Sequence, residues 1–281
     1  LRQEKDDEQA RYDVAAALQV WTERCIKHVI TEALKQYPSK NLCLSGGVTL
    51  NCVMTTKLYD WFDFENIYIT PTPHDGGLCI GAAQYLWHHE MDNPRINWED
   101  NFTPYLGQKY NSTDITDTIK KYDKIQYKTV SDDDVLELLS KQNIVSVFGG
   151  GSESGRRALG NRSILADPRS DKMKDLINEK VKHRQWFRPF APSILREEVS
   201  NWFEKDIDSP YMNFAVKFLE NMKDKVPAVV HLDGTGRIQT VTKNDNNWYY
   251  SFIKKWYNIS GVPILLNTSF NDREPIVETP E

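Results

Sequence analysis

The segment VKHRQWFRPFAPS sets four cationic or potentially cationic side chains, Lys182, His183, Arg184 and Arg188, among bulky apolar residues. Charges in such surroundings are unfavourable unless an anion meets them. Lys182 and Arg184 are two residues apart, so in an extended chain both project from one face. Two cations ~4 Å from one phosphate charge contribute several kcal/mol at an effective dielectric constant of about 20. The segment therefore predicts a site that holds and polarises a phosphoryl group.

A second basic segment, GGGSESGRRALGNRSILADPRS, combines glycines and serines with Arg156, Arg157, Arg162 and Arg169. Glycines expose the backbone, and guanidinium groups bind phosphate or carboxylate through two parallel hydrogen bonds. From residue 151 to 196 the sequence contains eleven Lys or Arg against five Asp or Glu. We expect anion binding here. The alternative is a surface loop whose arginines form ion pairs with Glu153 and Asp167.

A short polar motif, NTSFN, follows a predicted buried strand and places Ser269 and Asn271 two residues apart. A hydroxyl and an amide on the same side of a strand end can bind phosphate or acyl oxygens. Taken alone, Ser-x-Asn is also an ordinary turn motif, so both interpretations stay open.

Two glycine-rich turns, SGGVTLN and PTPHDGGLCIGAA, each connect a predicted strand to a predicted helix. Glycine N–H groups and a helix N-terminus can receive a phosphate, although SGGVTLN lacks the lysine of a P-loop. Asp75 in the second turn is favoured as a helix N-cap on its chemistry alone. The alternative is that Asp75 is a carboxylate ligand to a metal that carries a phosphate, with His74 as a possible second ligand.

The composition is that of a globular protein, with 281 residues, 40% hydrophobic and 27% charged, for which we expect two domains. No apolar run approaches ~20 residues, so we expect no membrane association. The net charge of −5 argues against a nucleic-acid partner. The charged first residues do not resemble a secretory signal. We expect a cytoplasmic protein in which four cysteines are buried free thiols: Cys25, Cys43, Cys52 and Cys79.

The hydrophobic pattern predicts an α/β fold. A first helix is predicted from an apolar stripe that we expect to be buried: Val14, Leu18, Trp21, Cys25, Val29 and Ala33. We predict strands at 41–47 and 66–70, helices at 48–62 and 78–90, and then a linker at 91–108. After a domain boundary near Gly107, we predict helices at 131–142, 172–181 and 248–257. Strands are predicted at 144–150, at 228–241 with a turn inside, and at 261–271.

Six stretches of the sequence, in this order, together resemble the NodU/CmcH-type O-carbamoyltransferases: SGGVTLNCV, HDGGLCIGAA, SGRRALGNRSILADPR, WFRPFAPSIL, HLDGTGRIQTV and GVPILLNTSFN with EPIVETP. The resemblance implies that residues 1–107 form part of an actin/sugar-kinase-like (ASKHA) carbamoyl-transfer domain with a linker. Residues 108–281 would then be a mixed α/β YrdC-like domain. The Lys-x-Arg and Ser-x-Asn hallmark of that domain would be Lys182, Arg184, Ser269 and Asn271.

The family's chemistry, by resemblance, is an ATP-dependent carbamoyl transfer. The enzyme would join carbamoyl phosphate to ATP, giving carbamoyl-adenylate and pyrophosphate, and pass the carbamoyl group to a hydroxyl of a small-molecule or glycan acceptor. Mg²⁺ would accompany ATP, and iron(II) or another divalent metal held by Asp75 would assist transfer. The resemblance assigns catalysis to Lys182, Arg184, Arg157, Ser269 and Asn271. It assigns nucleotide binding to Ser45, Gly46, Gly47, Asn51, Arg162, Arg188, His231 and Arg237.

The sequence also departs from the family. The resemblance starts about halfway through the first domain, and the family's His-x-x-x-His metal pair has no counterpart here. Gly151 stands where the family often has arginine, and Arg156 where it often has proline. We expect a fragment or split-gene part that self-associates or binds a partner supplying the N-terminal half. Rival expectations are a non-catalytic adenylate-binding module, or an enzyme that carbamoylates a protein or threonylcarbamoylates tRNA.

Overall fold

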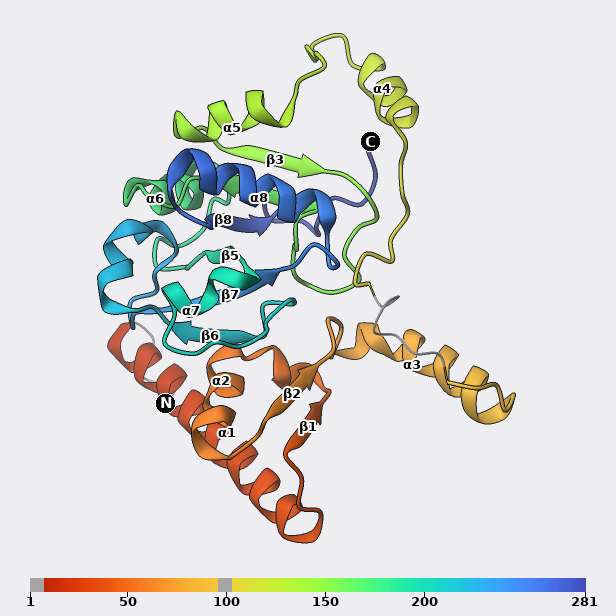
Figure 1. The fold of residues 1–281 in the computed structure, drawn as a ribbon, viewed down its shortest axis with the longest axis vertical. Helices are drawn as coiled ribbons and strands as arrows, with labels where there is room; N and C mark the ends of the chain where they lie inside the picture. The colour runs from red at the N-terminus through yellow and green to blue at the C-terminus, as the bar shows by residue number, and fades with distance from the viewer. Residues whose placement is uncertain (1–7, 96–102) are drawn as a thin grey trace.

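The computed structural model describes residues 8–95 and 103–281, which form helices, a two-stranded sheet and a six-stranded sheet (Figure 1). The helices are α1 (Glu8–Gln36), α2 (Cys52–Trp61), α3 (Leu78–Tyr85), α4 (Ser112–Lys120), α5 (Asp132–Ser140), α6 (Lys172–Lys180), α7 (Val199–Trp202) and α8 (Asn247–Ser260). The strands are β1 (Asn41–Leu44), β2 (Asn66–Ile69), β3 (Val145–Phe148), β4 (Arg162–Ala166), β5 (Ala191–Leu195), β6 (Phe214–Lys217), β7 (Thr235–Val241) and β8 (Ile264–Ser269). The predicted α/β class is confirmed. Residues 96–102 of the predicted linker lie outside the described part.

The smaller sheet consists of β1 and β2, which pair in parallel. The long helix α1 lies beside α2 on this sheet, at the lower edge of Figure 1. The apolar stripe predicted to be buried on α1 is instead open to solvent, because the helix turns Ile26 and Ile30 toward the core. Leu18, Trp21 and Val29 are 65%, 64% and 61% exposed. The prediction of a buried stripe is therefore wrong.

The cysteines are free thiols, as predicted, but the prediction that they are buried is wrong. Cys25 and Cys43 are exposed because α1 and β1 are covered on one side only. Cys79 is exposed on α3, and Cys52 is half-buried at the start of α2.

The larger sheet has the strand order β3-β4-β8-β5-β7-β6. Its neighbouring strands are antiparallel except for β5 and β7, which run parallel. Helix α8 lies across the sheet in Figure 1 and packs against α5 and β5. Helix α5 begins at Ser131, whose side chain accepts a hydrogen bond from Asp134 N, while the Asp134 carboxylate accepts one from Ser131 N. This capping box matches the start predicted for that helix.

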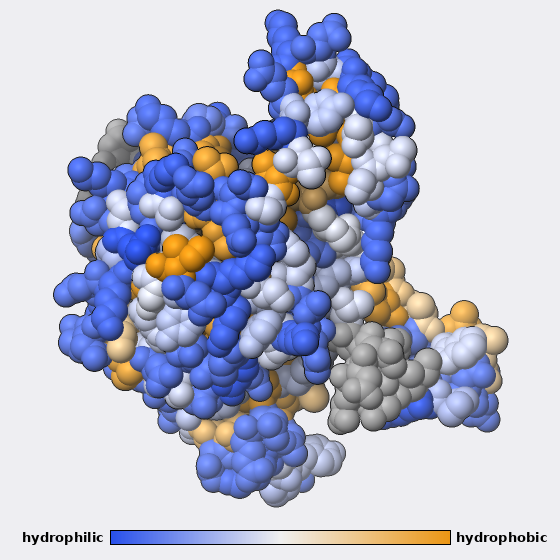
Figure 2. Space-filling view, turned by 45° about the horizontal axis from the view of Figure 1, so that its top comes forward, coloured by the Kyte–Doolittle hydropathy of each residue, from blue (hydrophilic) through white to orange (hydrophobic). Residues whose placement is uncertain are grey.

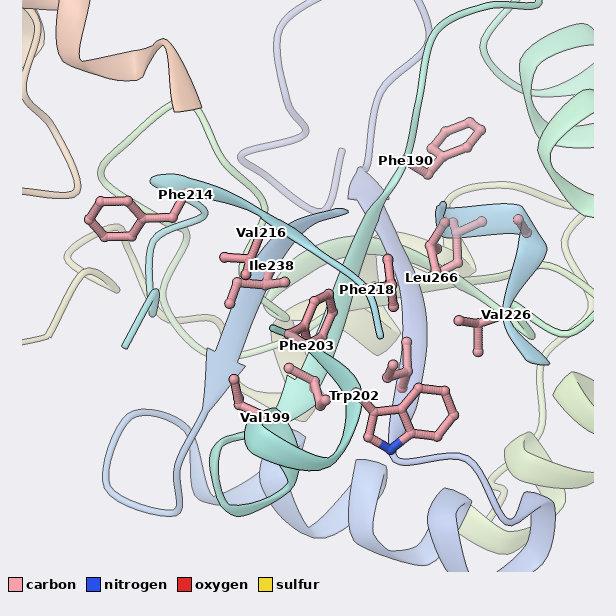
Figure 3. Close-up of a cluster of buried hydrophobic side chains, with 14 of the residues drawn as sticks. Phe190, Val199, Trp202, Phe203, Phe214, Val216, Phe218, Val226, Ile238 and Leu266 are labelled. Carbon is pink, nitrogen blue, oxygen red and sulfur yellow. The ribbon is translucent and has the colours of Figure 1, made fainter. Parts of the chain in front are cut away.

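A single hydrophobic cluster joins the two sheets. Around β5, β6 and β7 it contains the side chains labelled in Figure 3, among them Trp202, Phe203 and Phe218. The same cluster includes Met54 and Leu58 of α2, neither of which is exposed. Polar contacts reinforce the junction, since Thr56 Oγ1 accepts a hydrogen bond of 2.8 Å from the backbone N–H of Ala215. The domain boundary predicted near Gly107 stays a prediction.

Four strand predictions need correction. The first strand predicted within residues 228–241 is a 3₁₀ turn, Pro227–Val229, and only β7 is a strand there. Conversely, β4, β5 and β6 were not predicted, because their apolar runs are only four or five residues long and β5 contains Pro192. β4 lies inside one basic segment and β5 begins at the end of the other, so these two strands fix where the arginines lie.

No helix within the described ranges is long and apolar enough to cross a membrane. The face seen in Figure 2 is mostly hydrophilic, with hydrophobic residues in several separate patches, one of them on the arm formed by α3 and the π-helical turn after it, Leu86–Glu90.

Candidate functional site

Five arginines line one small pocket at the ends of the strands of the larger sheet. The pocket has a volume of about 260 Å³. Its arginines are Arg156, Arg157, Arg184, Arg188 and Arg237. No aspartate or glutamate of the described chain lines it. We call it the arginine pocket, and its lining brings together basic side chains from segments that are distant in the sequence.

The arginines reach this pocket from three separate elements. Arg156 and Arg157 lie on the loop between β3 and β4, whereas Arg184 and Arg188 lie on the loop between α6 and β5. Arg237 is on β7. Because β4, β8, β5 and β7 are consecutive in the sheet, these elements meet at one place.

No carboxylate of the described chain neutralises the guanidinium groups of the pocket, three of which, those of Arg157, Arg184 and Arg237, are half-buried. Among the described residues none of the five forms an ion pair, and the Nε atoms of Arg157 and Arg237 are buried without a hydrogen-bond partner. Burial, and then the neighbouring Arg237, lower the pKa of Arg157 to about 10. Burial, and then the neighbouring Arg188, lower the pKa of Arg184 to about 10. Leaving such groups unpaired is unfavourable, so the pocket has the electrostatics of an anion site.

Lys182 lies beside the pocket and is almost fully buried, with 3% exposed. Its ammonium group donates to Asn271 O at 2.7 Å, Asn271 Oδ1 at 2.8 Å and Ser269 Oγ at 3.2 Å. The structure thus brings together the Lys-x-Arg and Ser-x-Asn motifs. Burial, and then the neighbouring Arg184, lower the pKa of Lys182 to about 8.

The assumption that Lys182 and Arg184 project from one face is wrong. His183 between them has φ 45°, so the chain turns there instead of running extended. Lys182 points inward to the end of β8, while Arg184 donates to Asn178 Oδ1 at 2.7 Å and lines the pocket.

Other predicted anion ligands lie elsewhere. Arg162 is fully buried, donates to Gly149 O at 2.7 Å and stacks over the Phe148 ring at 3.8 Å, so the structure does not bring it to the pocket. His231 does not line the pocket either; burial lowers its pKa to about 4, and its Nδ1 is 3.0 Å from Thr235 Oγ1.

The alternative interpretation of the second basic segment is a surface loop with ion pairs to Glu153 and Asp167, and within the described residues only the ion pair to Asp167 forms. Arg169 binds Asp167 through Nη2 at 2.8 Å and Nε at 2.9 Å, as that alternative predicts. Glu153, in contrast, pairs with no arginine of the described chain.

A second, larger pocket of about 860 Å³ lies against the two glycine-rich turns of the first part of the chain. Ser45, Gly46, His74 and Asp75 line it. Gly46 has φ 101°, a conformation that glycine adopts without strain and that lets the chain turn under the pocket. We call it the large pocket.

The remaining predicted residues of the first turn have local roles. Asn51 caps α2 by accepting from Met54 N at 3.1 Å and donates to Gln19 Oε1 at 2.7 Å. Gly47 lies next to His74 but does not line the large pocket.

The described residues do not by themselves fit a metal centre. Asp75 lies on the wall of the large pocket, but no group of three His, Cys, Asp or Glu in the described ranges could hold a metal ion. His74 Nδ1 accepts a hydrogen bond of 3.0 Å from Gly76 N, so in the neutral ring the proton is on Nε2, which then cannot bind a metal. The metal site stays a prediction.

The basic loop between β3 and β4 borders both pockets. Ser154 lines the large pocket, and Arg156 and Arg157 line the arginine pocket. Because Ser154 and Arg156 are two residues apart, at most ~7 Å separates their Cα atoms. Between them, Gly155 packs so closely on the first part of the chain that an added Cβ would lie 2.2 Å from Pro71 O.

Two residues of the arginine pocket are not among the ligands assigned from the sequence. Arg156 belongs to the basic segment expected to bind an anion but is not assigned as a ligand, and Asn267 is not singled out at all. Asn267 Oδ1 is buried without a partner, while its Nδ2 donates to Ala158 O at 3.0 Å. An asparagine inside the apolar run PILLN was the available signal.

Two family models match the chain. The model described as carbamoyltransferase N-terminus matches residues 1–84, and the one described as carbamoyltransferase C-terminus matches residues 136–281. The arginine pocket lies within the second match, and all predicted residues of the large pocket lie within the first.

Similar proteins include an uncharacterized protein of Methanocaldococcus jannaschii, 39% identical over 95% of this chain and 45% of its own length. Nodulation protein NolNO of Sinorhizobium fredii is 38% identical over 96% of the chain and 41% of its own length. Nodulation protein NolO of Bradyrhizobium diazoefficiens is 37% identical over 96% of the chain and 50% of its own length. The chain spans about half the length of these relatives. On these matches, the chain belongs to the carbamoyltransferase family.

Proposed function

We propose that the chain carries the carbamoyl-activating part of an O-carbamoyltransferase, with ATP and carbamoyl phosphate bound at the arginine pocket. The observation that carries this proposal is the convergence of five arginines without a carboxylate in the described chain. Two polyanionic substrates repel each other, so their reaction needs fixed cations on both. Lys182 holds Ser269 and Asn271 at the edge of the same pocket, where they would orient phosphate oxygens.

The proposed activation has a definite balance of atoms. Carbamoyl phosphate and water give carbamate and inorganic phosphate. A carbamate oxygen then attacks the α-phosphorus of ATP, and the bond to the β-phosphate breaks, which gives carbamoyl-adenylate and pyrophosphate. Mg²⁺ would accompany ATP. The guanidinium groups would stabilise the charge that develops on the leaving pyrophosphate.

The acceptor in this proposal is a hydroxyl of a small molecule or glycan, bound at the large pocket. Its wall offers Tyr68 and Tyr85 together with Thr72 Oγ1 and Ser154 Oγ, two buried hydroxyls without partners. The short step from Ser154 to Arg156 supports a direct passage of the reactive intermediate from one pocket to the other. A metal at Asp75 belongs to the proposal only if ligands come from outside the described residues.

A partner for the first part of the chain also belongs to the proposal. Leu18 and Trp21 on α1, and Leu78 on α3, are 65%, 64% and 70% exposed. Large exposed apolar surfaces of this kind mark contact sites. We infer that they contact a second copy or a segment corresponding to the rest of the relatives' length. Size-exclusion chromatography with light scattering measures the molar mass and tests this inference. A monomeric mass at all concentrations, without aggregation or adsorption to the column, would contradict it.

The deciding experiment is carbamoyl phosphate-dependent exchange of labelled pyrophosphate into ATP. We expect exchange with the chain, and its loss in Arg184→Met. Arg169→Met is a matched control outside the pocket and should keep exchange after correction for folded protein. ATP binding without exchange would favour a non-catalytic adenylate-binding module, and no ATP binding would refute the proposal.

A further inference from the structure

The side chain of Glu153 closes the loop that carries Arg156 and Arg157. One carboxylate oxygen, Oε1, accepts hydrogen bonds from the backbone N–H groups of Leu159 at 2.7 Å, Asn161 at 2.9 Å and Arg162 at 3.3 Å. Oε2 of the same carboxylate is buried without a partner in the described chain. An ionised acceptor strengthens such bonds, so Glu153 ties the start of the loop to its end.

Hydrogen bonds of backbone groups hold the two stems of this loop, whereas in the described part of the chain its tip is held only by the packing of Gly155 on Pro71 and by the long bond of 3.4 Å from Arg157 to Leu50 O. Ser154 N donates to Pro104 O at 2.7 Å on one stem, and Leu159 O accepts from Gln239 Nε2 at 2.8 Å on the other. No backbone hydrogen bond between described residues holds Gly155, Arg156 or Arg157. The position of the tip therefore depends on how the stems are held together.

We propose that Glu153 is a positioning residue for polyphosphate binding: its carboxylate holds the loop closed and thereby directs Arg156 and Arg157 into the arginine pocket. This inference rests on the proposed function of that pocket. Glu153 is the acidic residue nearest in sequence to the two arginines, and it binds backbone N–H groups instead of guanidinium groups. It fixes the arginines without neutralising them, which leaves their charge for the ligand.

The expected loss of polyphosphate affinity follows from the population of the closed loop. If the stems separate so that the closed loop is populated about one time in ten, the apparent affinity for a polyphosphate falls about tenfold. The effect acts through the two arginines, so it should largely vanish when Arg156 and Arg157 are both already absent.

The experiment compares Glu153→Ala, which removes the acceptor, with Glu153→Gln, which keeps an oxygen acceptor of the same reach. Isothermal titration with inorganic tripolyphosphate gives the affinity, and trypsin cleavage after Arg156 or Arg157, followed by mass spectrometry, reports loop opening without any ligand. Glu137→Ala, which removes an exposed pair with Lys141, is the control.

We expect Glu153→Ala to bind tripolyphosphate about tenfold or more weakly and to be cut faster at the loop. Glu153→Gln should stay within about threefold of the wild type. Glu153→Ala combined with Arg156→Met and Arg157→Met should bind about as weakly as Arg156→Met with Arg157→Met. If the alanine variant does not fold, Glu153→Asp, whose shorter side chain pulls the carboxylate from the N–H groups, should show both effects.

Unchanged cleavage and affinity in Glu153→Ala, or in Glu153→Asp when alanine does not fold, would overturn the inference. Additive losses in the combined variant would also overturn it, because they would show that Glu153 does not act through Arg156 and Arg157. A wild-type chain that binds no tripolyphosphate would refute the proposed function instead, and the cleavage comparison would still decide the role of Glu153.

Discussion

Replacing Arg157 by methionine should stabilise the unliganded protein while weakening anion binding. Burial is the main reason why the pKa of Arg157 falls from 12.5 to about 10, which corresponds to roughly 3 kcal/mol of unfavourable free energy for the charged form. The side chain is half-buried, so solvent screening reduces this to about 1–2 kcal/mol. Its one hydrogen bond, to Leu50 O at 3.4 Å, is long and contributes at most ~0.5 kcal/mol.

The net gain for Arg157→Met is therefore about 1 kcal/mol. For a chain of this size that raises the melting temperature by about 2–4 °C. Saturating tripolyphosphate reverses the order, because a ligand at ~100 times its dissociation constant adds about 2.7 kcal/mol to the wild type. The variant, which binds more weakly, gains less.

Thermal melts with and without tripolyphosphate test this prediction, and Arg169→Met is the matched control. Arg169 pairs with Asp167, which is fully buried and also accepts hydrogen bonds from Gln142 Nε2 and the backbone N–H of Arg169, so loss of the Arg169 side chain removes the ion pair and should cost about 1–3 kcal/mol. A lower melting temperature for unliganded Arg157→Met would refute the reasoning, since it would show that Arg157 is a satisfied structural residue.

Three further outcomes are expected. Because burial lowers the pKa of Lys182 from 10.5 to about 8, the folded chain binds fewer protons than the unfolded chain between these pH values. The contribution of Lys182 to stability should therefore rise with pH in that window, while the affinity for tripolyphosphate falls above about pH 8. Lys182→Met should remove both trends, as measured by thermal melts and by titration. Gly155→Ala should lower stability by about 1–3 kcal/mol and weaken tripolyphosphate binding, because the new Cβ meets Pro71 O; an unchanged melt and affinity would contradict the close packing. Arg162→Met should lower the melting temperature by several degrees, because it removes the hydrogen bond to Gly149 O and the contact with Phe148. The affinity of the folded protein for tripolyphosphate should not change. A loss of affinity without a loss of stability would show that Arg162 is a ligand after all.

The fold class and most helices could be predicted because periodicity and capping are local signals. The capping box at Ser131 and the stripe of Phe252 and Trp256 on α8 are examples. β4 and β5 could not be predicted, because each is only five residues long and is buried on both faces, so it shows no alternation. Which face of α1 is covered also depends on tertiary contacts that its sequence does not encode.

The candidate site could be predicted in its chemistry but not in its geometry. Charge density pointed to Arg157, Arg184 and Arg188, and the structure places all three in one pocket. The sequence could not show that Arg162 has a different role, because Arg157 and Arg162 lie in the same basic segment. Only the fold decides that Arg157 lines the pocket and Arg162 is buried elsewhere. The sequence also could not assign a role to Glu153, because the hydrogen bonds of its carboxylate are to backbone N–H groups.

The two strands of the smaller sheet each leave one long side unpaired, since β1 bonds only to β2 within the described residues. An unpaired strand side is a template for another extended chain. Two such sides facing opposite ways do not close on themselves, so molecules that join through them add one after another into filaments. Concentrating this chain should therefore produce fibrous precipitate sooner than discrete oligomers, and a peptide with the sequence of β1 or β2 should slow that growth.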